Sequence, residues 1–273
     1  MSDRSLLVRH QNIAQGLTIS LSPHDAGWDH IGFDLLRSAA GASWEGRTGE
    51  REVGLVPVAG TARVVSSVGE WPAVGGRSSP FDGLPHCLYL PANTSYRIEA
   101  QSALEMAICS APATASHPPL LVTPDQVQVH TRGEGQCQRQ IRDILMEDTP
   151  AADSLLLTEV YSPAGNWSSY PPHKHDEDRM PAESPLEETY YFKIKPAQGF
   201  ALQRVYTSDG TLDQTVAPRD GDLVLVPRGY HTVGAPHAYE VWYLNVLAGP
   251  RRTLRVAFDP EHVWIKDSWE RAW

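Results

Sequence analysis

Short runs in which apolar and polar residues alternate make up most of this chain, and glycine and proline separate them. Side chains of a β-strand point to opposite faces in turn, so each alternating run predicts a strand. Runs of this kind occupy residues 17–21, 31–36, 53–58, 62–67, 87–90, 103–109, 155–161, 188–194, 200–206, 222–226, 239–246 and 255–258. Many short strands joined by turns predict an all-β fold of sandwiches or barrels.

The strand pattern occurs twice. Residues 110–119 are small, polar and rich in proline, which is typical of a linker. On each side of this segment, a series of strands leads to a proline-containing turn and one late strand, at 90–96 and again at 226–231. We therefore predict a duplicated barrel, with an N-terminal domain at 1–118 and a C-terminal domain at 119–273.

The charge of the chain restricts its partners. The 273 residues carry a formal net charge of −10. Nucleic acids and anionic membranes are therefore poor partners. An acidic substrate would also be repelled at long range, so a site for such a substrate needs a local group of arginine or lysine side chains.

The cysteines and the ends of the chain indicate the compartment. The three cysteines have no zinc-motif spacing, and the sequence shows neither a signal peptide nor a run of about 18 apolar residues that a membrane span needs. We expect a cytoplasmic protein with reduced thiols. Tryptophans at 264, 269 and 273 place large apolar rings near the C-terminus. We expect these rings to pack against a barrel face or against a partner subunit in a homo-oligomer.

The candidate chemistry is concentrated between residues 171 and 231. His173 and His175 are two positions apart and so lie on the same face of a strand. Glu188 begins an alternating run, with Glu187 beside it as the alternative ligand, and His231 follows a Pro-x-Gly turn. Three imidazoles and one carboxylate are a common ligand set for a divalent transition metal. We predict one metal site, whose ion is zinc, manganese, iron or nickel.

The first half of the chain lacks this ligand set. Tyr96 stands at the position that His231 occupies in the second half, and residues 43–49 replace the His-x-His segment. We therefore predict the metal site in the C-terminal half only.

The pattern of His-x-His, Glu, Pro-x-Gly and His resembles the two conserved motifs of the cupin superfamily. It departs from them in a longer interval between His175 and Glu188, and in having one residue rather than two between Pro-x-Gly and His231. These departures lead to a narrower resemblance. Residues 169–176, 186–192, 224–231 and 239–250, together with 89–97 and 138–145, resemble the 5-deoxy-glucuronate isomerase family of inositol catabolism.

The resemblance implies a fold and an activity. The fold is a bicupin, that is, two tandem jelly-roll (cupin) β-barrels, which the related 5-keto-4-deoxyuronate isomerases share. The activity is the conversion of the sugar acid 5-deoxy-glucuronate to 5-dehydro-2-deoxy-gluconate, an aldose–ketose isomerisation. Such a reaction needs a divalent cation that stabilises the enediolate, and a general base that moves a proton from C2 to C1. It also needs a cation for the distal carboxylate.

Residues can be nominated for each of these roles. The metal ligands are His173, His175, Glu188 and His231. The candidates for proton transfer are Glu187, Tyr190 and Tyr243. The candidates for binding the substrate carboxylate are Lys174, Arg204 and Arg228, and Arg142 is a further one.

Two other functions fit the same ligand set. Three histidines and one glutamate also suit an iron-dependent cupin dioxygenase. A non-catalytic bicupin that binds sugars or metal is the other alternative. Aromatic and basic residues around an open site favour an enzyme over a storage protein.

Overall fold

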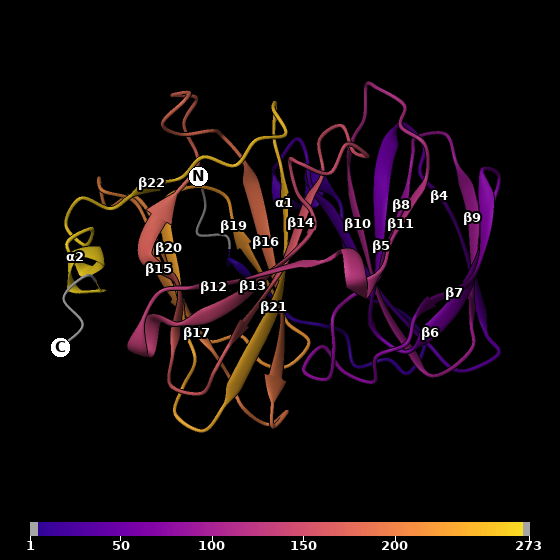
Figure 1. Ribbon diagram of the computed structural model, residues 1–273, viewed down its shortest axis with the longest axis horizontal. Helices are drawn as coiled ribbons and strands as arrows, with labels where there is room; N and C mark the ends of the chain where they lie inside the picture. Colours follow the sequence, from indigo (N-terminus) through magenta and orange to yellow (C-terminus); the bar gives the residue numbers. More distant parts are fainter. Residues whose placement is uncertain (1–4, 270–273) are drawn as a thin grey trace.

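The computed structural model describes residues 5–269, and these form two β-barrels that lie side by side along the longest axis (Figure 1). Each predicted run contains or overlaps a strand, so the all-β bicupin prediction is confirmed. The short helices of the described chain are α1 (Pro23–Ala26), α2 (Ile265–Trp269) and the single-turn 3₁₀ segments η1 (Pro124–Gln126) and η2 (Gly135–Cys137).

The first barrel consists of a six-stranded and a four-stranded antiparallel sheet. In spatial order, the larger sheet contains β11 (Leu120–Val122), β8 (Cys87–Leu90), β5 (Arg51–Ala59), β10 (Leu104–Pro112), β3 (Gly32–Ser38) and β2 (Gly16–Leu21). The smaller sheet contains β4 (Ser43–Arg47), β9 (Ser95–Ala100), β6 (Thr61–Ser66) and β7 (Gly69–Gly75).

The second barrel repeats this plan with additional strands. Its larger sheet contains β1 (Leu7–Val8), β19 (Leu223–Val226), β16 (Glu187–Lys195), β21 (Glu240–Ala248), β14 (Leu156–Ser162), β13 (Arg139–Leu145) and β12 (Gln128–Arg132). Its smaller sheet contains β18 (Asp213–Val216), β17 (Leu202–Tyr206), β20 (Tyr230–Gly234), β15 (Trp167–Lys174) and β22 (Ala257–Phe258).

The predicted division between residues 118 and 119 does not separate the two larger sheets completely. Strand β1, at the start of the chain, pairs with β19 of the second barrel. Strand β11, which follows the division, pairs with β8 of the first barrel. Each barrel therefore receives one edge strand from the other half of the sequence.

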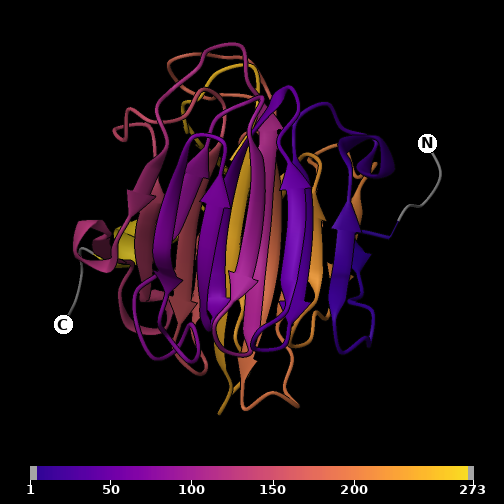
Figure 2. The ribbon, with the colours of Figure 1, turned by 90° about the vertical axis from the view of Figure 1, so that its right-hand side faces the viewer.

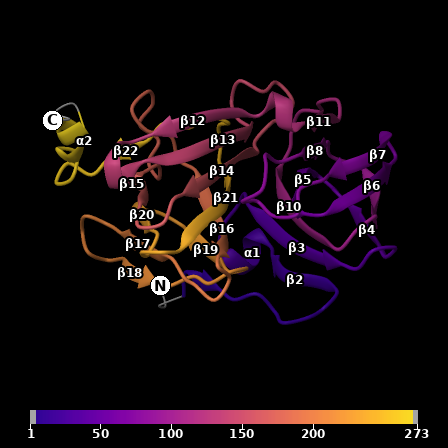
Figure 3. The same cartoon turned by 60° about the horizontal axis from the view of Figure 1, so that its bottom comes forward.

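The two larger sheets pack face to face between the barrels, as the views in Figure 2 and Figure 3 show. Their shared core contains Phe33 and Val56 from the first barrel and Leu157 and Trp242 from the second. The contact is close, because a Cβ atom at Gly54 would lie 2.6 Å from Leu157 Cδ1. Strands such as β5 and β21 are thus covered on both faces, which explains why their sequences are almost continuously apolar.

The interior of the first barrel is filled at the position that corresponds to the predicted metal site. Strands β4 and β9 pair with Gly46 opposite Tyr96, just as β15 and β20 pair with His173 opposite His231. A Cβ atom at Gly46 would lie 2.4 Å from Tyr96 Cζ, so the buried tyrosine ring occupies this space.

The homo-oligomer expected from the C-terminal tryptophans stays a prediction. Trp264 is 61% exposed, whereas the side chains of Trp269 and Trp273 lie outside the part of the chain that the structure describes. Among the described residues, no helix has the length and apolar character that crossing a membrane requires.

Candidate metal centre and active site

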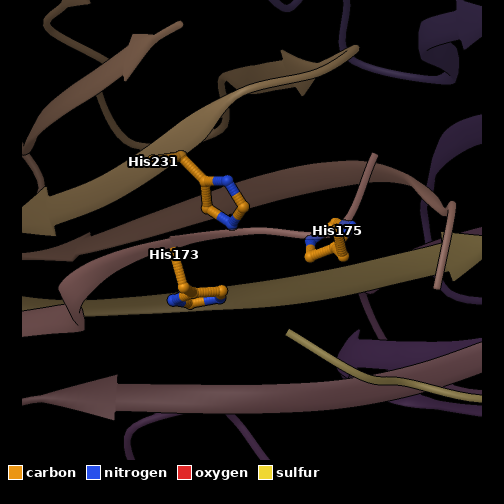
Figure 4. Close-up of side chains that lie close together, drawn as sticks. All are labelled: His173, His175 and His231. Atoms are coloured by element: carbon orange, nitrogen blue, oxygen red, sulfur yellow. The ribbon is translucent and has the colours of Figure 1, made fainter. Parts of the chain in front are cut away.

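Three histidine side chains meet inside the second barrel (Figure 4). His173 lies near the end of β15, and His175 follows one residue after this strand ends. His231 lies on the neighbouring strand β20, directly opposite His173 in the strand register. The ligand nitrogens of the three side chains all lie within 4.8 Å of one another. The period of two in the strand therefore brings His173 and His175 to the same interior space, as predicted.

Glu188 approaches the histidines from the larger sheet. Because neighbouring residues of a strand point to opposite faces, Glu188, Tyr190 and Phe192 of β16 all face the interior of the second barrel. The Glu188 Oε2 atom lies 3.0 Å from His175 Nε2 and 3.1 Å from His231 Nε2. The side chain of Glu188 is almost completely buried.

The hydrogen-bonding pattern of this cluster fits a metal ion. His175 Nδ1 lies 3.1 Å from the carbonyl oxygen of Leu186, and His231 Nδ1 lies 3.1 Å from that of Gly229. A proton on each Nδ1 donates to these carbonyls and leaves lone pairs on both Nε2 atoms, facing the Glu188 carboxylate. Facing acceptors repel each other unless a cation lies among them. His231 Nε2 is fully buried and has no hydrogen-bond partner in the described chain.

The spacing of the ligand atoms points to the same conclusion. Two ligands that lie about 2.1 Å from an ion and 90° apart are about 3.0 Å from each other. The distances from Glu188 Oε2 to the two imidazole nitrogens have this value. The donor set of three nitrogens and one carboxylate oxygen suits zinc, manganese, iron or nickel equally well.

Burial and the neighbouring ligands shift the titration of these groups. Burial, the largest effect, and the adjacent imidazoles lower the pKa of His173 well below its ordinary value. Burial alone would raise the pKa of Glu188, but the imidazoles of His175 and His231 beside its carboxylate outweigh burial and bring the pKa far below its usual range. Burial alone would lower the pKa of His175, but the adjacent Glu188 carboxylate raises it. Metal binding requires neutral imidazole and ionised carboxylate. The shifts at His173 and Glu188 favour those forms.

The metal-ligand cluster lines a cavity of about 240 Å³. His173, His175 and Glu188 are part of its wall. The other lining residues are His130, Arg132, Arg139, Ile141, Asp143, Met146, Thr158, Val160, Ser169, Tyr190, Tyr243, Asn245, Leu247 and Leu254. A cavity this small accommodates a molecule of about the size of a sugar acid, so a bound molecule would touch most of its wall.

Tyr190 and Tyr243 lie in this cavity, as predicted for proton-transfer candidates. Ser169 Oγ is 3.1 Å from the Tyr190 hydroxyl and 3.4 Å from the Tyr243 hydroxyl. Burial raises the pKa of Tyr190 well above its ordinary value, and the charge of Glu188 adds to the effect. Burial also raises the pKa of Tyr243, to about 12. Both phenols are therefore protonated at neutral pH and act as hydrogen-bond donors.

The structure places Glu187 away from the cavity, which corrects the prediction that it acts as a proton-transfer group. Its carboxylate accepts hydrogen bonds from the backbone amides of Asp29, His30 and Ile31 in the first barrel. The reason is the alternation of the strand: because Glu188 points into the barrel, Glu187 points out of it.

Lys174 is also directed away from the cavity, which corrects its prediction as a substrate-binding residue. Its ammonium group is nearly buried and donates to Asp176 at 2.5 Å, to Glu177 at 2.8 Å and to Glu183 at 2.8 Å. Hydrogen bonds from Lys174 and Arg179 overcome the effect of burial on Glu183 and lower its pKa to about 2. Lys174 lies between His173 and His175 in the sequence but on the opposite face of the strand, so its ion pairs hold this segment in place.

Arg204 and Arg228 are exposed outside the second barrel, which corrects their assignment to the substrate carboxylate. Arg204 forms two hydrogen bonds with Asp213, of 2.9 and 2.8 Å. It lines a separate cavity, near Trp167. Arg228 donates to the Thr211 hydroxyl at 3.1 Å. The fourth cation considered, Arg142, is buried on the far face of β13, where it donates to backbone carbonyls and lies 3.5 Å from Glu159.

Sequence reasoning missed Arg132 and Arg139, the two arginines that line the cavity. They lie directly opposite each other in the β12–β13 pair. Like charges in this arrangement destabilise a sheet. Among the described residues no carboxylate pairs with either arginine, and Arg139 donates instead to the Cys137 carbonyl oxygen at 3.1 Å. Burial lowers the pKa of the Arg139 guanidinium, as does the charge of Arg132. The signal in the sequence was the period of two, which puts Arg139 on the same strand face as Ile141 and Asp143.

Sequence reasoning also missed the pair of His130 and Asp143. Both residues line the cavity, and His130 Nε2 lies 3.1 Å from Asp143 Oδ2. An imidazole held by a carboxylate is a common arrangement for general acid–base chemistry. The two residues are 13 positions apart in the sequence and meet through the register of β12 against β13, which sequence spacing alone does not reveal.

Comparisons with known proteins show relatives that match this chain over nearly its whole length. The chain is 44% identical over 266 residues to the 5-deoxy-glucuronate isomerase of Geobacillus kaustophilus, covering 97% of this chain and 96% of that protein. It is 39% identical over 268 residues to the protein of the same name from Lacticaseibacillus casei, covering 96% and 99%.

Solved structures show the same relationship. The crystal structure of an IolB-like protein from Salmonella typhimurium superposes with a TM-score of 0.93 at 43% identity, covering 96% of this chain and all of that one. An oxalate decarboxylase from Lactobacillus farciminis superposes with a TM-score of 0.68 at 12% identity, covering 94% and 89%, and so shares the fold alone. A model described as the KduI/IolB family matches residues 6–265. This chain belongs to the KduI/IolB family.

Proposed function

We propose that this protein is a metal-dependent isomerase that converts 5-deoxy-glucuronate to 5-dehydro-2-deoxy-gluconate in inositol catabolism. The observation that carries the proposal is the convergence of three histidines and Glu188 on one small cavity. The 5-deoxy-glucuronate isomerases to which the chain is similar over nearly its whole length support it. An oxygenase and a non-catalytic binding protein are the alternatives, and nothing in the comparisons favours them.

The proposed metal ligands are His173, His175, Glu188 and His231. A divalent ion held by these residues would act as a Lewis acid toward the substrate oxygens and would offset the negative charge that develops on them. The donor set admits zinc, manganese, iron and nickel, so the experiment below includes each of them.

Arg132 and Arg139 are the proposed partners of the substrate carboxylate. They place two positive charges at the wall of the cavity that holds the metal ligands. Their mutual repulsion is relieved when a carboxylate binds between them, and arginine suits this group because its planar fork donates two parallel hydrogen bonds. The positive charge of these two arginines also offsets the long-range repulsion between an acidic substrate and a chain of net charge −10.

The reaction requires two proton movements, one from C2 to C1 and one from the C2 hydroxyl to the C1 oxygen. His130, held by Asp143, is the proposed base for the carbon-bound proton, since imidazole accepts and returns protons near neutral pH. The protonated hydroxyl groups of Tyr190 and Tyr243 are the proposed donors to the substrate oxygens.

The proposed function is tested by NMR of 5-deoxy-glucuronate in deuterated water. The chain, supplied in turn with each candidate metal, is expected to form the keto acid in anaerobic buffer and to introduce deuterium at C1. Treatment with a chelator should stop the reaction, and the productive metal should restore it. No conversion by any metal-loaded sample would refute the isomerase, and oxygen consumption dependent on ferrous iron would establish the oxygenase instead.

Replacement of the proposed base gives a second test. The variant His130→Gln is expected to lower kcat by about 10²- to 10⁴-fold, the usual contribution of a general base, with little change in KM or metal content. His262→Gln is a matched control, because His262 is similarly exposed and also lies near an aspartate, but lines the separate cavity near Trp167. Loss of activity in Tyr190→Phe with full activity in His130→Gln would move the role to the tyrosine.

A further inference from the structure

The Glu187 side chain connects the active-site strand to the other barrel. Its Oε1 accepts a hydrogen bond of 2.7 Å from the amide of Asp29, and its Oε2 accepts hydrogen bonds of 3.0 Å from His30 and 2.8 Å from Ile31. These three amides come directly before β3 of the first barrel. One carboxylate thus satisfies three successive backbone donors across the interface.

Glu52 makes the same connection in the opposite direction. Its Oε2 accepts a hydrogen bond of 2.8 Å from the amide of Asp153, and its Oε1 accepts hydrogen bonds of 2.7 Å from Ser154 and 2.6 Å from Leu155. These three amides come directly before β14 of the second barrel. Glu52 is fully buried and also accepts a hydrogen bond from the Tyr89 hydroxyl.

The two connections are related by the internal repeat of the fold. Glu187 lies at the start of β16 and Glu52 near the start of β5, and these strands hold equivalent places in the two larger sheets. An arginine accompanies each carboxylate: Arg51 donates to the His30 carbonyl oxygen, and Arg252 donates to the Leu155 carbonyl oxygen at 2.9 Å. We call each set of three hydrogen bonds to a glutamate an interbarrel clamp.

The clamps differ in what lies beside them. The residue that follows Glu187 is the proposed metal ligand Glu188, whereas the residue that follows Glu52 is Val53, a core residue of the first barrel. A residue whose side chain is held by three backbone donors has little freedom in its own backbone torsions. Those torsions also set the direction in which the next side chain leaves the strand.

We propose that Glu187 is a positioning residue, through which the first barrel fixes the metal ligand Glu188. Glu188 must hold its carboxylate close to the nitrogens of two imidazoles before an ion is present. A fixed backbone at Glu187 sets the direction of the Glu188 side chain and so lowers the free energy needed to assemble the site. The first barrel, which has Gly46 and Tyr96 where the second has ligands, thereby contributes to metal binding. This proposal rests on the ligand set in the proposed function, but not on the identity of the substrate.

Matched variants of the two clamps test the proposal. Glu187→Gln and Glu52→Gln each keep the size of the side chain, but turn an amide NH₂ group toward the backbone donors. Both should lower the unfolding temperature by several degrees, because each interrupts the interface. We expect Glu187→Gln to lower the affinity for Zn²⁺ by about 10- to 100-fold, the usual effect of losing a group that orients a ligand. Glu52→Gln should leave this affinity within about twofold.

The readout is competition for Zn²⁺ with a chelator of known affinity, together with the EPR spectrum of the Mn²⁺-loaded protein. If neither variant lost Zn²⁺ affinity, or if both lost it to the same extent, the positioning role would be overturned. The two clamps would then only stabilise the interface. If either glutamine variant does not fold, the milder pair Glu187→Asp and Glu52→Asp makes the same comparison. Metal titration needs no turnover, so a chain that failed to isomerise the sugar acid would refute the function without changing this result.

Discussion

Replacing His231 with glutamine is expected to remove tight metal binding and to lower kcat/KM by about 10³-fold or more. His231 is fully buried, and its Nε2 lies 3.1 Å from the Glu188 carboxylate without a hydrogen-bond partner among residues 5–269. Glutamine fills a similar volume but offers a weaker, harder ligand atom. The loss follows because a bound ion contributes several kcal/mol to the stabilisation of a developing enediolate charge.

The measurements for this variant are metal content after dialysis and steady-state kinetics. His237→Gln is the control, since His237 is exposed and lies outside the cavity, and it should keep the metal and the activity of the unmodified chain. Circular dichroism and the unfolding temperature establish that His231→Gln is folded. A folded variant that retained stoichiometric metal with unchanged affinity would contradict the ligand assignment.

Replacing Arg139 with methionine is expected to lower kcat/KM for the sugar acid by about 10²- to 10³-fold. Hydrogen bonds to a charged group contribute about 1.5–3 kcal/mol each, and arginine can supply two of them to one carboxylate. Most of the loss should appear as a higher KM, because the carboxylate is held in the same way before and during the reaction. Methionine keeps an unbranched apolar side chain in place of the arginine stem and relieves the repulsion from Arg132.

The control for this variant is Arg204→Met, which removes one of the cations first expected to bind the carboxylate. Arg204 is paired with Asp213 and lines the other cavity, so its replacement should leave kcat/KM nearly unchanged. The Zn²⁺ affinity of Arg139→Met should remain that of the unmodified chain. A large loss in Arg204→Met combined with full activity in Arg139→Met would place the carboxylate elsewhere.

The architecture could be predicted because it depends on local patterns. Alternating runs bounded by glycine and proline mark strands, and the repeated turn at 90–96 and 226–231 indicates two related barrels. The exchange of β1 and β11 between the barrels could not be predicted in this way. A strand of two or three residues has almost no periodicity, and its partner is selected by which sheet edge is available.

The cluster of three histidines and Glu188 could be predicted for a similar reason. A period of two puts His173 and His175 on one face, and the apolar residues that alternate with Glu188 identify it as the inward-facing member of the pair with Glu187. The cations could not be assigned, because arginine and lysine side chains are long and their charge can be directed to solvent, to a carboxylate or to a cavity. Lys174, Arg204 and Arg139 differ only in what the folded chain places near them.

The sequence by itself therefore determined the β-class of this protein, its internal repeat and the four residues proposed to bind metal, since each follows from spacing along one or two strands. Only the tertiary structure decided which cations face the cavity, that His130 meets Asp143, and that Glu187 and Glu52 join the two barrels. The contacts of Glu187 and Glu52 connect segments that are neighbours in space but not in sequence, and the contact of His130 with Asp143 depends on the register of the β12–β13 pair. Their geometry depends on sheet order and barrel packing, which no local pattern encodes.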